Sequence, residues 1–333
     1  MRAPTVRRYR RIVRVVVMED YQRAVERLAC FPAAGGHEIT VHAERPADLE
    51  ERVAQIGEAE VLVLIRERTP IDDALLERLP HLRLICQTGR GMPHLDIEAC
   101  TRRGVVVCSG GGSPYAPAEL TLALILASRR CLVEDAVALR AGAWQTTIGS
   151  ELRGRTLGIV GFGTIGALVA GYGLALGMHV LAWGREASLE RAQAAGVELE
   201  PDLEALLSRS HVASLHLKLT PETRGIVGAA QLARMRADAL LVNTARAALV
   251  APGALAAALA LGRPGRAAID VFDAEPAIDD PLVQSGLILA TPHLGYVTWE
   301  TYEAYFVQVF AQVDAFAAGS PVDMVNPEAF SRS

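Results

Sequence analysis

The sequence predicts an α/β protein built from two doubly wound parallel sheets. Short apolar runs typical of buried parallel strands alternate with helix-like segments along most of the 333 residues. A glycine-rich turn, Gly161–Gly166, joins one such strand to a helix, and a turn-rich break, Ser109–Pro114, separates two alternating patterns. The chain is 51% hydrophobic and 21% charged, which is typical of a globular protein, and it is long enough for two cores.

The stretch around the glycine-rich turn predicts a β-α-β unit. Leu157–Val160 is a short apolar run, Ile165–Leu176 has helical spacing, and Met178–Trp183 reads as a second strand. The turn between them has the pattern G-x-G-x-x-G, formed by Gly161, Gly163 and Gly166. Glycines let the backbone turn tightly and approach a pyrophosphate, which the helix N-terminus attracts. The pattern therefore indicates a Rossmann dinucleotide-binding unit.

A membrane span is the alternative for the same stretch. Between Arg155 and Arg185 there is no Asp, Glu, Lys or Arg, and the interval is long enough to cross a bilayer. Its glycines fall at turn positions rather than along one helical face, and a buried β-α-β unit is apolar on most faces. We therefore expect no membrane partner.

The end of the second strand bears on the choice of cofactor. A site for NAD commonly has an acidic residue there, which holds the ribose hydroxyls. This chain has Gly184, Arg185 and Glu186 instead. An arginine without a preceding carboxylate favours the 2′-phosphate of NADP, with Gly184 and Arg185 at the cofactor. The alternative is NAD, with Arg185 solvated and Glu186 on the ribose.

The first alternating pattern covers residues 12–108 and predicts a smaller flavodoxin-like domain. Asp72 is a plausible N-cap of one of its helices. The expected strands are Ile12–Met18, Glu38–Val41, Ala59–Ile65, Leu82–Gln87 and Val105–Cys108, and the expected helices are Gln22–Leu28, Pro46–Ile56, Asp72–Leu79 and Ile97–Arg102.

The second pattern starts with a long apolar helix, Ala116 to about Ser128, which continues in some form to Ala141. Beyond the β-α-β unit we expect the strands Val212–Leu217, Ala239–Asn243, Ala267–Asp270 and Leu287–Ala290 and the helices Ala229–Met235 and Pro252–Leu261. The tail, Glu300–Ala318, has aromatic residues at helical spacing and is expected to pack on the first domain. The predicted domains are thus 1–109 with 296–333 for the substrate, and 110–295 for NAD(P).

Three polar side chains follow strands of the second pattern and suggest a reaction. Ligand sites in open α/β sheets lie beyond the carboxyl ends of the strands, so Arg246, Glu275 and His293 should converge on the dinucleotide. Moving a hydride onto a carbonyl requires a proton, and His293 is the candidate acid/base. Glu275 beside it would favour the imidazolium. Arg246 offers a fork that can bind a substrate carboxylate and polarise the adjacent carbonyl.

With these motifs in this order, the chain resembles the D-isomer-specific 2-hydroxyacid dehydrogenase family over nearly its full length. The motifs are the glycine turn, Asn-Thr-Ala-Arg at 243–246, Asp-Val-Phe at 270–272, Glu-Pro at 275–276 and Pro-His-x-Gly at 292–295. The resemblance implies Arg246, Glu275 and His293 as the catalytic set. It also implies substrate binding by Arg90 and Gly91, in the loop Thr88–Asp96, together with Arg246. The implied cofactor contacts are Gly163, Thr164, Ile165, His216, Thr244, Ala245, Asp270 and Gly295, beside Gly161 and Gly166.

The chain departs from the family pattern in three places. Ala247 replaces a glycine after the catalytic arginine, and it is tolerable unless the backbone there needs a positive φ. Lys218 stands where the family often has proline. Trp144–Leu152 is short for a region that often helps form the dimer, although a homodimer remains the expectation.

The leading functional hypothesis is NAD(P)-dependent interconversion of a D-2-hydroxy acid and its 2-keto acid. A cofactor-sensing, corepressor-like binding protein is the alternative from another class. A formate dehydrogenase on the same scaffold is disfavoured, because Thr291 stands where those enzymes have glutamine. Arg66, Arg68 and Arg90 hint at an acidic substrate, but each is equally suited to a solvated position or to pairing with Glu67.

Composition excludes several partners and sites. A net charge of −5 gives no reason to expect nucleic acid, and the five cysteines show no metal-ligand spacing. Unpaired cysteines suit a reducing compartment, so a cytoplasmic location is expected. The arginine cluster within residues 2–14 is interpreted as a solvated extension that leads into the first strand.

Overall fold

The computed structural model describes residues 11–332. Contacts divide the chain into two compact units, which are described separately. Unit 1 comprises Met1–Ser113 and Thr298–Ser333, and unit 2 comprises Pro114–Val297. Most of the arginine-rich extension predicted at the N-terminus falls on residues 1–10, outside the described residues.

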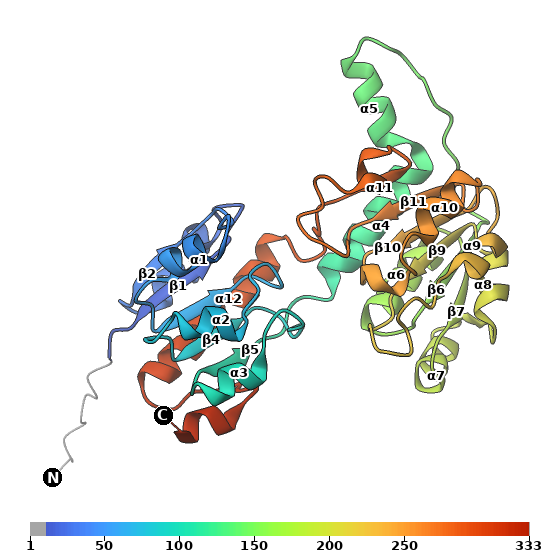
Figure 1. Ribbon diagram of the computed structural model, residues 1–333. Helices are drawn as coiled ribbons and strands as arrows, with labels where there is room; N and C mark the ends of the chain where they lie inside the picture. The colour runs from blue at the N-terminus through green and yellow to red at the C-terminus, as the bar shows by residue number, and fades with distance from the viewer. Residues whose placement is uncertain (1–10, 333) are drawn as a thin grey trace. The chain divides into compact units, whose positions relative to one another are not determined.

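Unit 1 contains a five-stranded parallel sheet with the order β2-β1-β3-β4-β5 (Figure 1). Every residue of β3 and β4 is buried, as expected for central strands covered on both faces. This order is the flavodoxin-like one, as predicted. The strands are β1 (Arg14–Met18), β2 (Glu38–Val41), β3 (Val61–Leu64), β4 (Leu84–Gln87) and β5 (Val106–Ser109).

Aspartates begin three helices of unit 1 by accepting backbone N–H groups. Asp72 accepts from the N–H of Leu75, so its predicted role as an N-cap is confirmed. The C-terminal α12 buries an aromatic face that includes Phe306 and Phe310, and Phe310 contacts the ring of Phe31. The helices of unit 1 are α1 (Leu49–Ile56), α2 (Asp73–Glu77), α3 (Ile97–Arg102) and α12 (Trp299–Ala317), with 3-10 turns η1 (Val25–Arg27), η2 (Phe31–Ala34) and η4 (Pro327–Arg332).

The helix predicted over Gln22–Leu28 is wrong. Arg23 adopts a left-handed backbone with φ of 50°, and Leu28 is extended, so only the 3-10 turn η1 forms between them. The carboxylate of Asp20 accepts the N–H of Val25 at 2.9 Å. A side chain therefore takes the donor that a preceding helical turn would otherwise use.

Unit 2 contains a seven-stranded parallel sheet with the order β12-β11-β10-β9-β6-β7-β8. The chain runs outward from β6 through β7 to β8, and then returns to β9 on the other side of β6. This reversal between β6 and β9 is the switch point of a Rossmann sheet, so the predicted fold class is confirmed. The strands are β6 (Thr156–Val160), β7 (His179–Trp183), β8 (Glu198–Leu199), β9 (Val212–Leu215), β10 (Leu240–Asn243), β11 (Arg266–Ile269) and β12 (Ile288–Ala290).

Helices cover both faces of this sheet. The first core cluster joins α4 and α6 to one face, and the second joins α8, α9 and α10 to the other. The predicted long helix is broken at Cys131, whose φ is 52°, and continues as α5. The helices of unit 2 are α4 (Tyr115–Arg130), α5 (Leu132–Arg140), α6 (Thr164–Ala175), α7 (Glu186–Ala194), α8 (Leu203–Arg209), α9 (Ala229–Arg234), α10 (Ala254–Ala260) and α11 (Pro281–Gln284), with the 3-10 turn η3 (Ala247–Leu249).

The charge-free stretch between Arg155 and Arg185 folds into β6, α6 and β7. Within residues 11–332, no helix combines the length and the apolar character that crossing a bilayer requires. The segments α7, β8 and α8 were not predicted. Several residues of α7 and β8 are exposed, so this region lacks the regular apolar spacing from which a buried helix or strand is predicted.

Alanine substitutions at two glycines of α6 should have opposite effects on the stability of the protein. A Cβ at Gly166 would lie 2.2 Å from the carbonyl oxygen of Gly161, whereas a Cβ at Gly171 would meet nothing within 4 Å. Gly166→Ala should lower the free energy of unfolding by about 1–3 kcal/mol through overpacking. Gly171→Ala should raise it by about 0.5–1 kcal/mol, because alanine is the better helix former. Urea denaturation of both variants measures the difference, and equal effects would contradict this packing.

Candidate active site

The turn between β6 and α6 has the geometry that a dinucleotide pyrophosphate requires. Gly161 has a left-handed backbone with φ of 100°, and a Cβ there would lie 2.9 Å from the backbone of His216 and Leu217. Gly163, the N-cap of α6, has open space where a Cβ would stand. The N–H groups of the first turn, which include those of Thr164 and Ile165, have no acceptors within the helix and lie at the positive end of its dipole. These residues fit the phosphates of a dinucleotide cofactor.

The residues expected to flank the cofactor follow β9 and β10. His216 donates its backbone N–H to the carbonyl of Val160, and its Nε2 lies 2.8 Å from the hydroxyl of Ser214. Burial lowers the pKa of His216 to about 4, so the ring is neutral at neutral pH. Thr244 pairs its hydroxyl with that of Thr121 at 2.7 Å, and Ala245 follows it in the chain. All three lie beyond the carboxyl ends of their strands.

The end of β7 lies beside the glycine turn, and an arginine of α7 contacts that turn. Gly184 follows the strand, and a Cβ on it would stand 3.6 Å from the backbone nitrogen of Phe162. Arg185 is exposed at the N-cap of α7. Arg191, one helical turn or more beyond, donates from Nη2 to the carbonyl of Phe162 at 3.3 Å. Arg191 was missed in the sequence, because its contact with the turn depends on how α7 is oriented.

The buried carboxylate of Asp270 holds the loop that carries His293. Its Oδ1 accepts from the hydroxyl of Thr291 and from the N–H of Leu294, each at 2.7 Å, and its Oδ2 accepts from the N–H of Gly295 at 2.9 Å. Burial raises the pKa of Asp270, while these hydrogen bonds and the charge of His293 act against that rise. Asp270, expected as a cofactor contact, is therefore also the anchor of residues 291–295.

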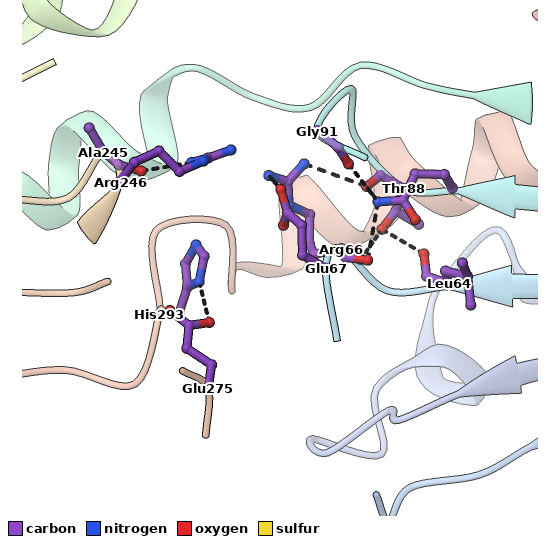
Figure 2. Close-up of polar contacts among 10 residues, drawn as sticks. Leu64, Arg66, Glu67, Thr88, Gly91, Ala245, Arg246, Glu275 and His293 are labelled. Atoms are coloured by element: carbon purple, nitrogen blue, oxygen red, sulfur yellow. Dashed lines mark hydrogen bonds and ion pairs between the residues drawn. The ribbon is translucent and has the colours of Figure 1, made fainter. Parts of the chain in front are cut away.

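His293 pairs with Glu275 as the sequence predicted. The Nδ1 of His293 lies 2.7 Å from Oε2 of Glu275 (Figure 2). Oε1 of Glu275 accepts the N–H of Phe272 at 3.0 Å. Burial pushes the pKa of Glu275 up, but the hydrogen bond and charge of His293 outweigh it, so that the pKa lies below its ordinary value. His293 has a left-handed backbone with φ of 52°. Such strain in a non-glycine residue often marks a functional position.

Arg246 completes the group within unit 2. Its carbonyl accepts from the side-chain amide of Asn243 at 2.9 Å, and its Nη1 donates to the carbonyl of Ala245 at 2.7 Å. The charge of Arg246 also contributes to the lowered pKa of Glu275. Ala247 is not among the described residues with positive φ, so its methyl group is accommodated. The arrangement offers a cation and a carboxylate-oriented imidazole at the same sheet edge.

The predicted substrate loop lies in unit 1, directly after β4. Arg90 is exposed, and the carbonyl of Gly91 accepts from the side-chain amide of Gln87 at 3.1 Å. The same amide donates to the carbonyl of Thr88 at 3.2 Å. One buried glutamine thus fixes the backbone on both sides of Arg90.

Comparison with known proteins shows the family to which the chain belongs. Residues 122–295 match the NAD binding domain of the D-isomer specific 2-hydroxyacid dehydrogenases. A glyoxylate reductase from Aeropyrum pernix is 38% identical over 297 residues, which cover 85% of this chain and 88% of that protein. The chain belongs to the D-isomer specific 2-hydroxyacid dehydrogenase family.

Other relatives show how far the match extends. The crystal structure of an oxidoreductase from Ralstonia solanacearum is 45% identical, with a TM-score of 0.93 over 96% of this chain and 98% of that one. A D-3-phosphoglycerate dehydrogenase from Mycobacterium leprae is 37% identical over 88% of this chain. The match covers 56% of that protein, so the chain spans about half the length of the phosphoglycerate dehydrogenases that it resembles.

Proposed function

We propose that this protein interconverts a D-2-hydroxy acid and its 2-keto acid with a nicotinamide dinucleotide. The observation that supports the proposal most is the 2.7 Å contact between His293 and Glu275, at the sheet edge that also carries Arg246. Asp270 holds the histidine loop at the same edge. The family relationship supports hydride transfer as the reaction class.

A nicotinamide dinucleotide held at the glycine turn, residues 161–166, would supply the hydride that reduces the carbonyl carbon. Negative charge then develops on the carbonyl oxygen, and the guanidinium of Arg246 stabilises it while also binding the carboxylate. Nδ1 of His293 is directed to Glu275, so Nε2 is the nitrogen that delivers the proton to that oxygen. In the direction of oxidation, Nε2 accepts the hydroxyl proton. The loop 88–96 is proposed to bind the carboxylate through the N–H groups of Arg90 and Gly91.

Replacing the proposed proton donor should slow turnover strongly but leave cofactor binding unchanged. We expect His293→Asn to reduce kcat by about 100- to 10,000-fold, the usual contribution of general acid–base catalysis. Steady-state assays with glyoxylate and hydroxypyruvate, together with fluorescence titration of the cofactor, measure the two effects. His179→Asn is the matched control, because His179 is exposed at the start of β7.

Unchanged kcat in His293→Asn would contradict the assigned role. Tight cofactor binding by the wild type without turnover of any 2-keto acid would instead favour the cofactor-sensing alternative. The two readings are therefore separated by the wild-type assay alone.

Loss of Glu275 should change the pH dependence of reduction. Burial raises the pKa of Glu275, but the hydrogen bond and charge of His293 outweigh it, so that the carboxylate is ionised down to a pH below its ordinary range. Glu275→Gln removes this charge from beside Nδ1 of His293. The kcat/KM for reduction should therefore fall, and the loss of rate on protonation of Glu275 at low pH should disappear from the profile. A profile with the height and shape of the wild type would contradict the pairing.

We further propose that the cofactor is NADP(H), bound at its 2′-phosphate by Arg185 and Arg191. Arg185 is exposed at the end of β7, and Arg191 contacts the glycine turn through the carbonyl of Phe162. Two guanidinium groups near the adenosine ribose would match the charge of a 2′-phosphate. NAD, with Glu186 on the ribose hydroxyls, is the alternative.

Cofactor titrations distinguish these readings. Arg185→Ala should raise the Kd for NADPH by about 10-fold or more, the value of a lost charge-assisted hydrogen bond, and leave the Kd for NADH nearly unchanged. Glu186→Gln is the control, and it should affect neither. Weaker NADH binding in Glu186→Gln, with NADPH unaffected in Arg185→Ala, would establish the alternative.

We propose that the chain forms a homodimer through α5 and the segment that follows it. In Figure 1 this part of unit 2 extends away from its sheet, and α5 buries no residue. The segment exposes several large apolar side chains, which are Leu132, Val133, Val137, Leu139, Trp144 and Ile148. A second copy of the same surface would remove them from water.

Light scattering tests the dimer. The double substitution Trp144→Asp and Ile148→Asp should yield a monomer, because it places charges in the proposed apolar contact. Leu261→Asp is the control, since Leu261 is 85% exposed at the end of α10. A wild-type mass of one chain, or a double variant that keeps the mass of two, would contradict the proposal.

A further inference from the structure

A cavity of about 160 Å³ lies in unit 2, at the amino ends of two strands. The end of α4, the segment after α5 and the residues that lead into β10 and β11 form its wall. α4 packs against both strands (Figure 1). Because the strands are parallel, this edge of the sheet is opposite to the edge that carries the proposed catalytic residues. One water molecule needs only about 10–15 Å³ of such volume, so the cavity has room for a small anion.

Two polar groups of the wall are buried without a hydrogen-bond partner. Arg129 is 5% exposed and Ser128 is 4% exposed. Nη1 of Arg129 donates to the carbonyl of Asp238 at 2.7 Å, but its Nε has no partner within residues 11–332. The hydroxyl of Ser128 has none in the same range. Buried polar groups of folded proteins are nearly always paired, so these two require an explanation.

Backbone contacts fix the wall of the cavity. The carbonyl of Arg129 accepts the N–H of Ser150 at 2.7 Å, and the carbonyl of Ser128 accepts from Nη1 of Arg266 at 3.0 Å. A Cβ on Gly149 would lie 2.9 Å from the carbonyl oxygen of Arg129, so glycine allows the segment to approach α4 this closely. The arginines are therefore positioned by α4, β11 and the segment after α5 together.

Salt bridges near the cavity use three arginines and two carboxylates. Nη1 of Arg266 lies 3.2 Å from Oε1 of Glu134, and both side chains are half-exposed. The carboxylate of Asp238 has two cationic partners, Nε of Arg236 at 2.8 Å and Nη1 of Arg155 at 3.5 Å. The negative charge of Asp238 is therefore already neutralised by its own neighbours.

Arg129 adds a fourth guanidinium group. Burial lowers the pKa of Arg129, and the charges of Arg155 and Arg266 lower it further, against the effect of Asp238. Arginine stays protonated despite such a shift, so a positive charge is held here at a cost in free energy. His211 is neutral at neutral pH, because burial lowers its pKa. The groups named here are thus four guanidinium groups and two carboxylates, an excess of two positive charges.

We propose that this cavity binds a phosphate group, either inorganic phosphate or the phosphate of a monoester. A phosphate group carries a charge of about −1.5 to −2 at neutral pH, which matches the excess of positive charge better than a single carboxylate does. Its oxygens accept hydrogen bonds from guanidinium groups and hydroxyls. With small rotations of their side chains, Arg129 and Ser128 donate their unpaired N–H and O–H groups to these oxygens. The site does not depend on the reaction proposed above.

Calorimetric titration with inorganic phosphate tests the site. The protein is first saturated with the dinucleotide that it binds, so that phosphate cannot occupy the glycine turn, and NaCl keeps the ionic strength constant. We expect one phosphate per chain, and a Kd for acetate that is about 10-fold higher or more, because acetate carries the smaller charge. Glycerol 3-phosphate distinguishes the two sources of the group. Tighter binding than phosphate indicates an ester, and weaker binding indicates the free anion.

Variants place the phosphate in the cavity. Arg266→Gln should raise the Kd for phosphate by about 10-fold or more, the effect of a lost charge-assisted hydrogen bond. Ser128→Ala removes a hydroxyl that has no partner within residues 11–332, so the protein should still fold, and the Kd should rise about 5-fold. Arg234→Gln is the matched control, since Arg234 is an exposed partner of Glu204 in unit 2. It removes the same charge and should leave the Kd unchanged.

Thermal denaturation gives a second measurement. A ligand that binds only the folded state stabilises it, so phosphate should raise the Tm of the wild type more than that of Arg266→Gln. No phosphate binding by the dinucleotide-saturated wild type would overturn the proposal. Acetate bound as tightly as phosphate would do the same, as would equal Kd values for phosphate in Arg266→Gln and Arg234→Gln.

Two provisions keep the test decisive. Should Arg266→Gln fail to fold, Ser128→Ala decides, and an unchanged Kd for phosphate in it would contradict the site. Should the protein bind no dinucleotide, the cofactor role proposed above fails, but titration of the free protein still applies. Weaker binding in Arg266→Gln than in Arg234→Gln would then support the phosphate site by itself.

Discussion

The candidate active site depends on one buried carboxylate. Asp270 directly follows β11 and accepts three hydrogen bonds from residues 291–295, two of them from backbone N–H groups. A carboxylate that is completely buried must be satisfied by donors, and here all of them come from the loop that contains His293. The same contacts maintain the left-handed backbone of His293, which directs its Nδ1 to Glu275. A charge placed at the end of a strand thereby orients the proposed acid.

Parallel sheet geometry brings the remaining groups to the same edge of unit 2. The glycine turn follows β6, His216 follows β9, and Arg246 follows β10, with the reversal of strand order between β6 and β9. Since all strands of the sheet are parallel, their carboxyl ends lie together. The sheet therefore assembles residues that are more than a hundred positions apart in sequence, and the loops after its strands determine the chemistry.

Much of this could be predicted from the sequence, because buried strands and glycine turns have local signatures. Val61–Leu64 and residues 240–242 are continuous apolar runs, and they form the interior strands β3 and β10. The aromatic spacing of the tail predicted one buried face, which α12 has. The contact between His293 and Glu275 also followed from the positions of both residues after strands.

Features that depend on side chains competing for backbone groups could not be predicted. Gln22–Leu28 has helical composition. No α-helix forms there, because Arg23 has a left-handed backbone and the carboxylate of Asp20 accepts the N–H of Val25. The loop-anchoring role of Asp270 depends on which N–H groups fold back onto it. Similarly, the sequence does not show whether the side chains of Arg66 and Glu67 point to solvent or to each other. Their ion pair at 3.1 Å depends on the position of the loop after β4.

The account is tested most directly by kinetics of Asp270→Ala at saturating cofactor. If Asp270 positions His293, single-turnover reduction of a 2-keto acid should be about 100-fold slower than in the wild type even when the cofactor site is full, because a misplacement of about 1 Å costs that much. Asp270→Asn, which keeps one acceptor oxygen, should lie between the two. A rate that returns to the wild-type value once the cofactor is saturating would show that Asp270 only binds the cofactor, and would contradict the account.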